Sequence, residues 1–403
     1  MKIGLITCFF PDSERSCSGI GNHFLTLAEA LAERGHEVTV LHVCDEETYR
    51  RGESFIRDRL LHFDYYRIPK AESQGNGGGG FLSWAVREML DRIRTASRVA
   101  WIVRAIADER SFDVMETHSY HYPGLFFRFF RFRKCVVTRV STTARQMVPA
   151  QTVRSRVFAV EAFLEGSTIR SARHLVTHSP SHRDEVARDE RVDPDRFMIV
   201  PHGVVDIEDA TRLEPSDQIA GFVQVLFVGR FETRKGVDLL LEAIPEVIDS
   251  NPAIIFELVG QDDGHPAWEE FQKQYPQWIG EKVIARGVVE EEELLQAYAE
   301  CDLFVAPSRY ESFGLIYVEA MRFSKPVVGY EVGGVPDVVR DRETGILVEP
   351  FSIDGLVEAI TELGRLPGLR REMGNAGRKD FERRFSVEAL AQHSEDLYRT
   401  ILP

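Results

Sequence analysis

The chain has 403 residues, more than a single hydrophobic core usually organises, so two domains are expected. Hydrophobic residues make up 43% and charged residues 28%, values that are ordinary for a globular protein. The formal net charge of −15 argues against nucleic acid as a partner, because such binding needs a basic surface field.

The cysteines and the apolar runs bear on the cellular compartment. The chain has five cysteines, an odd number, and no two have the spacing of metal ligands, so free thiols in a reducing compartment are expected. No apolar run approaches the roughly 18 residues of a membrane span. The segment from Met1 to Pro11 lacks the long apolar region of a signal peptide. The sequence therefore predicts a cytoplasmic protein.

Positive charge is concentrated between Tyr120 and Arg183, a segment that contains eleven Lys or Arg residues and only two Asp or Glu residues. Within this region, Phe126, Phe127, Phe129, Phe130 and Phe132 are interleaved with Arg128, Arg131 and Arg133. This composition suits either a helix that docks on an anionic membrane surface or a buried helix with arginine tips in water. Peripheral contact with the inner membrane face through residues 120–183, and an anionic or lipid-linked acceptor, both stay open.

The first elements of the chain alternate between strand and helix. Lys2–Phe10 is an apolar run that predicts a strand, and the polar segment Pro11–Gly21 predicts a loop. Phe24–Arg34 has helical spacing of apolar residues, Gly35 suits a C-terminal cap, and Val38–Val43 predicts the next strand. A strand, helix and strand in about forty residues predict a parallel sheet with helices on both faces.

The same alternation continues through two halves of the chain. Further strands of the first half are predicted at Asp113–Glu116, Cys135–Val140, His174–His178 and Met198–Val200, with a flexible Gly-rich stretch at Gly75–Gly80. Strands of the second half are predicted at Val223–Val228, Ile254–Val259, Val283–Ile284, Leu303–Ala306, Pro326–Gly329 and Gly345–Val348. Helices of the second half are predicted at Val237–Ile248, Glu290–Glu300 and Leu315–Phe323.

The predicted fold class is α/β, with two Rossmann-like domains of parallel strands. The expected domains are residues 1–205, residues 206–385, and a final helix in residues 386–403. Parallel sheets bind ligands beyond the carboxyl ends of their strands, so the default site lies in a deep cleft between two sheets that face each other.

The strongest functional signal is the segment Arg309–Met321. It follows a predicted strand, and a helix is expected to begin near Gly314. The backbone N–H groups of Phe313, Gly314 and Leu315 are then unpaired at the first turn, which is a ready anion site. Glu311 precedes this helix and Glu319 lies within it. One carboxylate can reach a sugar ring and the other can accept hydrogen bonds from a pair of vicinal hydroxyls.

A second signal follows the strand that ends at Val228. Gly229 allows close backbone approach, and Arg230 and Lys235 bring two cations to the same region. Two cations and a helix N-terminus can stabilise the negative charge of a departing diphosphate without a metal ion. A weaker signal is the Gly-x-Gly of Gly19 and Gly21 in the first strand-to-helix loop, which lacks the third glycine of a dinucleotide fingerprint.

Together these segments resemble the family 4 retaining glycosyltransferases, whose architecture is called GT-B. The segments that carry the resemblance are Gly19–Gly21, Arg34–Val40, Val200–Val204, Gly229–Gly236, Glu311–Glu319, Gly333–Val339 and Thr344–Val348. They span nearly the whole chain. The pair Glu311 and Glu319, of which Glu311 lies inside Arg-Tyr-Glu-Ser-Phe-Gly-Leu and Glu319 follows it, is specific, whereas the glycine segments are not.

The resemblance implies roles for these residues. Arg230 and Lys235 would bind the donor diphosphate, Glu311 would hold the sugar near its anomeric carbon, and Glu319 would bind the ribose hydroxyls. The amides of Phe313, Gly314 and Leu315 would meet phosphate or sugar oxygens. The Gly19–Gly21 loop would close over the diphosphate. The resemblance also implies a last helix, about Val387–Leu402, that returns to the first domain.

The sequence departs from the family pattern on the acceptor side. Where many relatives carry a His after the strand at Cys135–Val140, this chain has Ser141, and at a second common His position it has Glu116, while His118 matches. Glu116, His118 and Arg139 are candidates to replace the missing His at the acceptor.

The expected reaction is transfer of a hexose-type sugar from a nucleotide diphosphate sugar, UDP being favoured, to an acceptor hydroxyl with retention of configuration. Such a reaction needs positioning and leaving-group stabilisation, and no cofactor or metal ion is expected. A non-catalytic nucleotide-sugar-binding subunit and another GT-B enzyme, such as an epimerase or a phosphorylase, stay open as alternatives.

Overall fold

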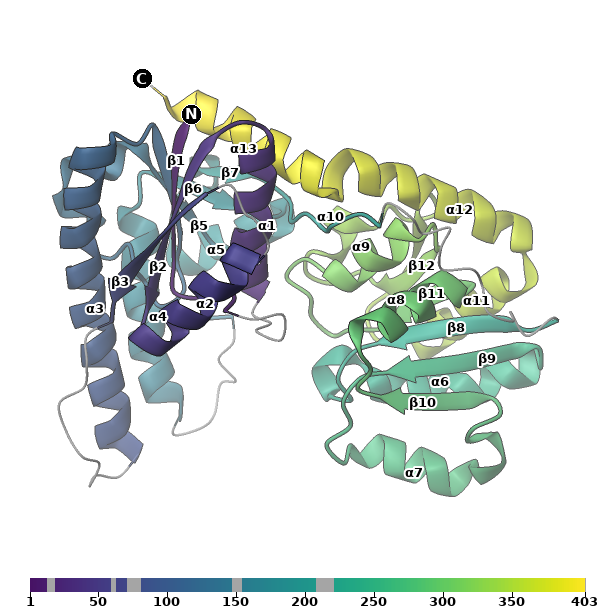
Figure 1. The fold of residues 1–403 in the computed structure, drawn as a ribbon. Helices are drawn as coiled ribbons and strands as arrows, with labels where there is room; N and C mark the ends of the chain where they lie inside the picture. The colour runs from purple at the N-terminus through teal and green to yellow at the C-terminus, as the bar shows by residue number, and fades with distance from the viewer. Residues whose placement is uncertain (13–18, 59–62, 71–80, 147–153, 208–220, 403) are drawn as a thin grey trace. The chain divides into compact units, whose positions relative to one another are not determined.

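The structure is a computed structural model, and it describes residues 1–12, 19–58, 63–70, 81–146, 154–207 and 221–402. The chain forms two compact units (Figure 1). The first consists of Met1–Gly203 and Val387–Pro403, and the second of Val204–Ser386. Cys17 and the predicted Gly-rich stretch Gly75–Gly80 lie outside the described residues.

The first unit is built on a seven-stranded sheet in the order β3-β2-β1-β4-β5-β6-β7, in which every pair is parallel. Its strands are β1 (Lys2–Thr7), β2 (Glu37–Cys44), β3 (Asp64–Pro69), β4 (Val114–His118), β5 (Val136–Arg139), β6 (His174–Thr177) and β7 (Phe197–Ile199). Its α-helices are α1 (Gly19–Glu33), α2 (Glu46–Asp58), α3 (Phe81–Arg110), α4 (Arg154–Ser171), α5 (Pro180–Glu190) and α13 (Val387–Ile401). Short 3-10 helices are η1 (Phe127–Phe129), η2 (Arg131–Cys135) and η3 (Pro194–Arg196).

The last helix of the chain, α13, belongs to the first unit and lies beside α1 (Figure 1). Phe24 and Leu27 of α1 pack with Leu390 and Tyr398 of α13 in one buried cluster. Burying a large apolar side chain contributes about 1.5–3 kcal/mol. The apolar spacing of both helices therefore explains why α13, although it ends the sequence, packs against α1 in the first unit.

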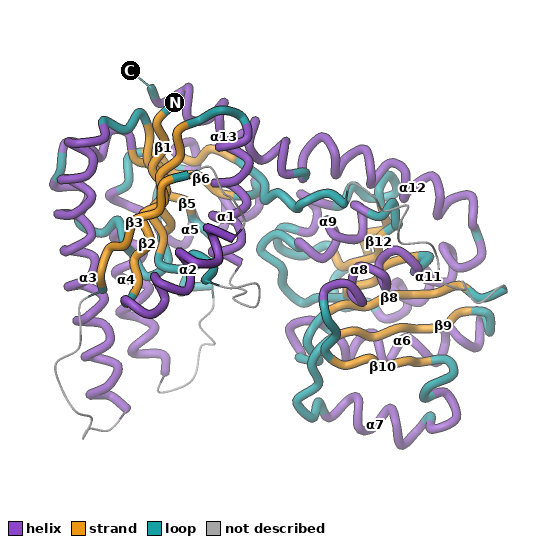
Figure 2. Tube along the Cα trace, viewed as in Figure 1, coloured by secondary structure: helices purple, strands orange, loops and turns teal. Residues whose placement is uncertain are grey.

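The second unit has a six-stranded sheet in the order β10-β9-β8-β11-β12-β13, which is also parallel throughout. Its strands are β8 (Val223–Val228), β9 (Ile254–Val259), β10 (Val283–Gly287), β11 (Leu303–Ala306), β12 (Val327–Tyr330) and β13 (Gly345–Val348). Its helices are η4 (Thr233–Lys235), α6 (Val237–Ser250), α7 (Pro266–Gln274), η5 (Pro276–Trp278), α8 (Glu291–Glu300), α9 (Leu315–Arg322), α10 (Val335–Val338), α11 (Ile353–Arg365), α12 (Pro367–Asp380) and the π-helical η6 (Phe381–Phe385). Figure 2 shows how loops join the ends of these strands to the helices that follow.

The predicted α/β architecture of two Rossmann-like domains with parallel sheets is confirmed, and β8, β9, β11 and β13 have the predicted bounds. The first helix differs from its prediction. α1 begins at Gly19, five residues earlier than expected, so Gly19 and Gly21 lie in its first turn and not in a loop. The elements α2, β3 and α3 were not identified from the sequence.

The aromatic and basic run of residues 122–133 is not a long helix, as both interpretations of the sequence assumed. It forms the two short 3-10 helices η1 and η2. His121 and Tyr122 have positive φ angles of 55° and 43°, and Pro123 and Gly124 follow directly, so the backbone is broken before a helix can propagate. Phe127 is buried, whereas Phe129 is 68% exposed.

Among the described residues, no helix is long and apolar enough to cross a membrane. The described part of the chain also holds no cluster of three or more His, Cys, Asp or Glu residues that is suited to a metal ion. Asp193, Pro194 and Asp195 form a capped turn, because the Asp193 carboxylate accepts a hydrogen bond from the Asp195 N–H at 3.0 Å.

Candidate active site

The loop after β8 carries the predicted cations. Arg230 Nη2 lies 3.1 Å from Glu232 Oε2, and Arg234 Nη2 lies 2.8 Å from Glu232 Oε1. The side chain of Arg230 is 62% exposed, so its charge faces solvent and remains accessible to an anion. Gly229 is held in place because its N–H donates to the carbonyl oxygen of Val259 at 2.9 Å.

Lys235 and Glu311 contact each other directly. Lys235 Nζ lies 2.6 Å from Glu311 Oε1, which also accepts a hydrogen bond from Ser308 Oγ at 2.9 Å. The two loops meet because β8 and β11 are neighbours in a parallel sheet, so their carboxyl ends open at the same edge. The lysine and glutamate side chains are 16% and 11% exposed, which weakens solvent screening of their charges.

Two glycines in these loops occupy conformations that other residues rarely adopt. Gly236 has φ 71°, and a Cβ there would lie 1.8 Å from the carbonyl oxygen of Pro307. Gly314 has φ 94°, and a Cβ there would lie 2.7 Å from the ring of Tyr317. Glycine is therefore required at both positions, and it allows the β8 loop and the β11 loop to approach closely.

A second ion pair fixes the two loops. Arg309 donates to both carboxylate oxygens of Asp238 at 2.7 Å, and its backbone N–H donates to the carbonyl oxygen of Arg234 at 2.8 Å. The hydrogen bond to Asp238 raises the pKa of the Arg309 guanidinium. A two-pronged contact of this kind restrains both orientation and distance, so it holds Lys235 opposite Glu311.

Helix α9 begins where the sequence placed it. Gly314 is the N-cap and provides no side-chain cap. The Tyr317 N–H donates to the Gly314 carbonyl oxygen at 3.0 Å, so the N–H groups of Leu315 and Ile316 are the ones placed to offer hydrogen bonds to an anion. The side chain of Phe313 is buried and contacts the edge of Phe385 at a ring distance of 5.8 Å, which anchors the loop. Leu315 is 36% exposed.

Glu319 lies within α9 and is hydrogen bonded to a tyrosine of α8. Tyr298 Oη donates to Glu319 Oε2 at 2.8 Å. Removal from water raises the pKa of Glu319, and the Tyr298 hydrogen bond together with the charges of Arg322 and Lys235 opposes this rise. One carboxylate oxygen is thus oriented by the protein, and among the described residues no second donor competes with a ligand for Oε1.

The first unit brings other predicted residues to the carboxyl ends of its strands. Gly21 is buried in the first turn of α1, and a Cβ at Gly19 would meet no atom within 4 Å. His118 is buried at the end of β4, where its Nε2 accepts a hydrogen bond from the Cys8 N–H at 3.1 Å. Burial lowers the pKa of His118 to about 4, so its imidazole is neutral near pH 7. Ser141 is half-buried two residues beyond β5.

Glu116 and Arg139 do not form an open acceptor surface, and this corrects the expectation for both. Arg139 Nε donates to Glu116 Oε1 at 2.5 Å, and Tyr398 Oη of α13 donates to Glu116 Oε2 at 2.6 Å. Arg139 Nη1 also donates to the carbonyl oxygen of Val200 at 3.2 Å. The Arg139 and Glu116 side chains are 3% and 1% exposed. Their charges are used to attach α13 to the sheet.

Sequence reasoning missed several residues that shape these sites. They are Ser308, Asp238, Tyr298 and Tyr398. Only Ser308 adjoins a predicted motif. Its position directly before the segment Arg309–Met321 could have identified it as a site residue. Asp238, Tyr298 and Tyr398 reach their partners through tertiary contacts across 71, 21 and 282 residues, for which the sequence has no local pattern.

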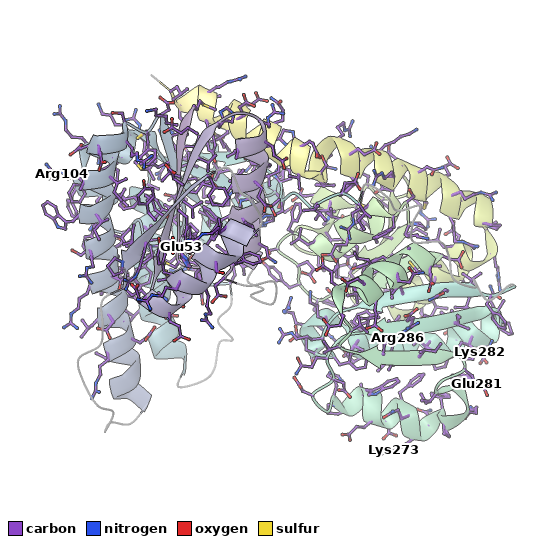
Figure 3. The ribbon with its side chains drawn as sticks, in the orientation of Figure 1. Glu53, Arg104, Lys273, Glu281, Lys282 and Arg286 are labelled. Carbon is purple, nitrogen blue, oxygen red and sulfur yellow. The ribbon has the colours of Figure 1, made fainter. Side chains whose placement is uncertain are left out.

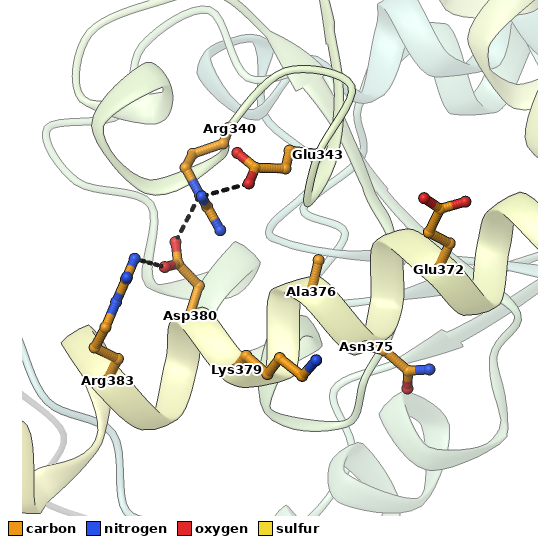
Figure 4. Close-up of a pocket in the computed structure, with 8 residues that line it drawn as sticks. All are labelled: Arg340, Glu343, Glu372, Asn375, Ala376, Lys379, Asp380 and Arg383. Atoms are coloured by element: carbon orange, nitrogen blue, oxygen red, sulfur yellow. Dashed lines mark hydrogen bonds and ion pairs between the residues drawn. The ribbon is translucent and has the colours of Figure 1, made fainter.

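A cavity of about 560 Å³ in the second unit lies around Asp380 and contains none of the predicted site residues (Figure 4). The Asp380 carboxylate is buried and lies 3.2 Å from Arg340 Nε, 2.7 Å from Arg383 Nη2 and 2.8 Å from Arg384 Nη1. These contacts join the end of α12 to the segment before β13. Arg340, Arg383 and Arg384 each pair with the Asp380 carboxylate, which indicates that this cluster has a structural role.

Comparison with known proteins relates both units of the chain to glycosyltransferases. Residues 214–380 match the model of glycosyl transferases group 1, and residues 18–203 match the glycosyl transferase 4-like domain. An uncharacterized glycosyltransferase of Methanocaldococcus jannaschii is 25% identical over 99% of this chain and 98% of its own length. A D-inositol 3-phosphate glycosyltransferase of Segniliparus rotundus is 30% identical over 59% of this chain and 54% of its own length.

Among solved structures, the Anabaena protein HepE in complex with UDP and glucose superposes with a TM-score of 0.67 at 18% identity, covering 99% of this chain and 100% of its own. The family models, taken together, cover both units, and the fold likeness spans the whole chain. The chain belongs to the family 4 glycosyltransferases of the GT-B fold.

Proposed function

We propose that this glycosyltransferase moves a hexose from a UDP-sugar to an acceptor hydroxyl with retention of anomeric configuration and without a metal ion. The observation that carries the proposal is the contact of Lys235 with Glu311 beside the N-terminus of α9. A cation, a carboxylate and the first amides of α9 then lie near one another at the carboxyl ends of β8 and β11. That combination suits a sugar attached to a diphosphate.

The proposed chemistry assigns separate tasks to these groups. Lys235, Arg230 and the first amides of α9 stabilise the charge that develops on the departing diphosphate. Glu311 accepts hydrogen bonds from the sugar, and Glu319 accepts them from the ribose hydroxyls. The acceptor oxygen bonds to the anomeric carbon on the face that the diphosphate leaves. Its proton passes to the departing phosphate oxygen, so no strong protein base is required.

The choice of UDP is supported by HepE, whose crystal structure is a complex with UDP and glucose. Glu319 supports a nucleotide with a free ribose diol, because a carboxylate with one oxygen held by Tyr298 has the other available. Calorimetric titration with UDP, GDP, ADP and their glucose derivatives tests the donor.

UDP or UDP-glucose is expected to bind tightly in a buffer that contains a chelator, and to raise Tm by mass action. The anomeric configuration of the product is then read from its proton NMR spectrum, and retention is expected. Binding that requires added Mg²⁺, an inverted product, or affinity for none of the nucleotides would each contradict the corresponding part of the proposal.

Tyr298→Phe is expected to shift the pH dependence of nucleotide binding. Because the Tyr298 hydrogen bond lowers the pKa of Glu319, its loss lets burial raise that pKa further. Ribose binding needs the ionised carboxylate, so affinity is present above the pKa and is lost as the pH falls through it. The acidic limb of UDP affinity should therefore move to higher pH in the variant, as measured by titration calorimetry across the acidic range.

Tyr275→Phe is the matched control, since Tyr275 stacks on Trp278 at a ring distance of 4.5 Å and is distant from α9 in sequence and contacts. Its binding profile should coincide with that of the wild type. A Tyr298→Phe profile that also coincides with the wild type would show that Glu319 does not bind the nucleotide.

A further inference from the structure

We propose that the first unit binds the phosphate of an anionic phospholipid headgroup between Arg128, Arg133 and Arg173, and so docks on a bilayer surface. This inference is independent of the proposed donor and reaction. The three arginines lie near the amino-terminal ends of β5 and β6. Ligands of parallel sheets bind at the opposite, carboxyl ends, so this site is separate from the candidate active site of the same sheet.

A small cavity lies between the three arginines. Its volume is about 20 Å³, and Thr138, Thr168 and Ser171 are among the residues that line it, with no acidic residue in the lining. Arg133 Nη1 donates to the backbone carbonyl oxygen of Arg128 at 3.1 Å, which holds the Arg133 side chain beside η1. The space is sufficient for about one water-sized group, which fits a phosphate oxygen and excludes a whole nucleotide.

These guanidinium groups keep their charge available. Among the residues that the structure describes, Arg128, Arg133 and Arg173 have no carboxylate within 4.0 Å. In contrast, two other arginines of the basic region, Arg145 and Arg170, both pair with the buried Glu190 at 3.1 and 2.8 Å. The predicted basic region therefore divides into arginines that stabilise the fold and arginines that remain open to an anion.

Exposed aromatic side chains adjoin the cavity and favour a bilayer over a small soluble anion. Phe129 is 68% exposed, and the Arg128 guanidinium lies 4.9 Å from its ring centre. Trp101 of α3 is 60% exposed and packs edge-on against Phe130 at 5.2 Å. Arg104, which points outward from α3 in Figure 3, lies 5.6 Å from the Trp101 ring. Aromatic rings beside guanidinium groups suit the boundary between headgroups and acyl chains.

Charge supports the same partner. With a net charge of −15, the protein as a whole is repelled by an anionic surface, so binding requires a local concentration of positive charge. Arg128, Arg133 and Arg173 supply it, because these guanidinium groups have no carboxylate partner among the described residues, unlike Arg145 and Arg170. The proposed contact uses arginines to bind headgroup phosphates while Phe129 and Trp101 enter the interface.

The test measures cosedimentation of the full chain with vesicles of phosphatidylglycerol and phosphatidylcholine, and with vesicles of phosphatidylcholine alone. The wild type should bind only the anionic vesicles, and binding should weaken as salt is raised. The triple variant R128Q/R133Q/R173Q should bind on the order of 100-fold more weakly, from about one kcal/mol for each arginine near the surface. F129S should also weaken binding.

The control variant R50Q/R51Q/R57Q removes the same charge from α2, where these arginines pair with Glu46, Asp12 and Glu53. It should bind anionic vesicles like the wild type. Equal loss in both triple variants, or equal binding to both kinds of vesicle, would overturn the proposal. A further outcome would also overturn it. In that outcome the wild type does not bind vesicles, and inorganic phosphate raises its Tm but not the Tm of R128Q/R133Q/R173Q. UDP affinity of R128Q/R133Q/R173Q, measured in parallel, tests the donor site separately.

Discussion

Lys235→Ala is expected to lower kcat/KM by about 100- to 1000-fold, the range found when one stabilising group is removed from a developing negative charge. The reason is the position of Lys235 Nζ, which is 2.6 Å from Glu311 and only partly exposed, where its charge is screened less than in bulk water. The measurement is a steady-state assay with the donor that calorimetry identifies, accompanied by circular dichroism to show that the fold is retained.

Lys273→Ala is the matched control, since Lys273 lies on α7, away from the β8 and β11 loops (Figure 3). It should retain full activity. The double variant K235A/E311A should lose less than the product of the two single losses, because the side chains contact each other and act as a unit. Activity of Lys235→Ala within about twofold of the wild type would remove the lysine from the proposed site.

Glu116→Ala is expected to destabilise the protein by about 3–5 kcal/mol, because it leaves the Arg139 guanidinium buried without its carboxylate. The Tyr398 hydroxyl loses its acceptor in the same variant, so the attachment of α13 to β4 is weakened as well. For a unit of this size, that loss corresponds to a fall in Tm of roughly 10 °C. Differential scanning calorimetry measures it.

Tyr398→Phe separates the two contributions, since it removes one hydrogen bond and leaves the ion pair in place, at a cost of about 1 kcal/mol. Glu46→Ala is the surface control, because the Glu46 side chain is 51% exposed and its ion pair with Arg50 contributes little. If Glu116→Ala and Glu46→Ala had equal Tm values, the buried network would not support α13 as the structure indicates.

The parts of the candidate site that the sequence predicted are those with local causes. The strand Leu303–Ala306 ends at a proline, and helix α9 starts after Gly314, so an apolar run and two conformationally special residues determine the loop between them. The bounds of β8 and the start of α6 were also predicted correctly, because they too depend on neighbouring residues in the sequence. In the first unit, by contrast, the prediction of a helix at residues 122–133 was wrong. The composition of this run suits a helix, but the positive φ angles of His121 and Tyr122 are incompatible with one.

The sequence by itself determined the parallel α/β architecture, the positions of the two principal motifs and the identity of the charged residues in them, because periodicity and turn residues act over a few neighbouring positions. Only the tertiary structure decided which charges meet. Lys235 contacts Glu311 across 76 residues, and Tyr398 contacts Glu116 across 282. The same folding assigned Glu116 and Arg139 to the core and left Arg128 and Arg133 at the surface, since burial and pairing depend on what the rest of the chain packs against each side chain.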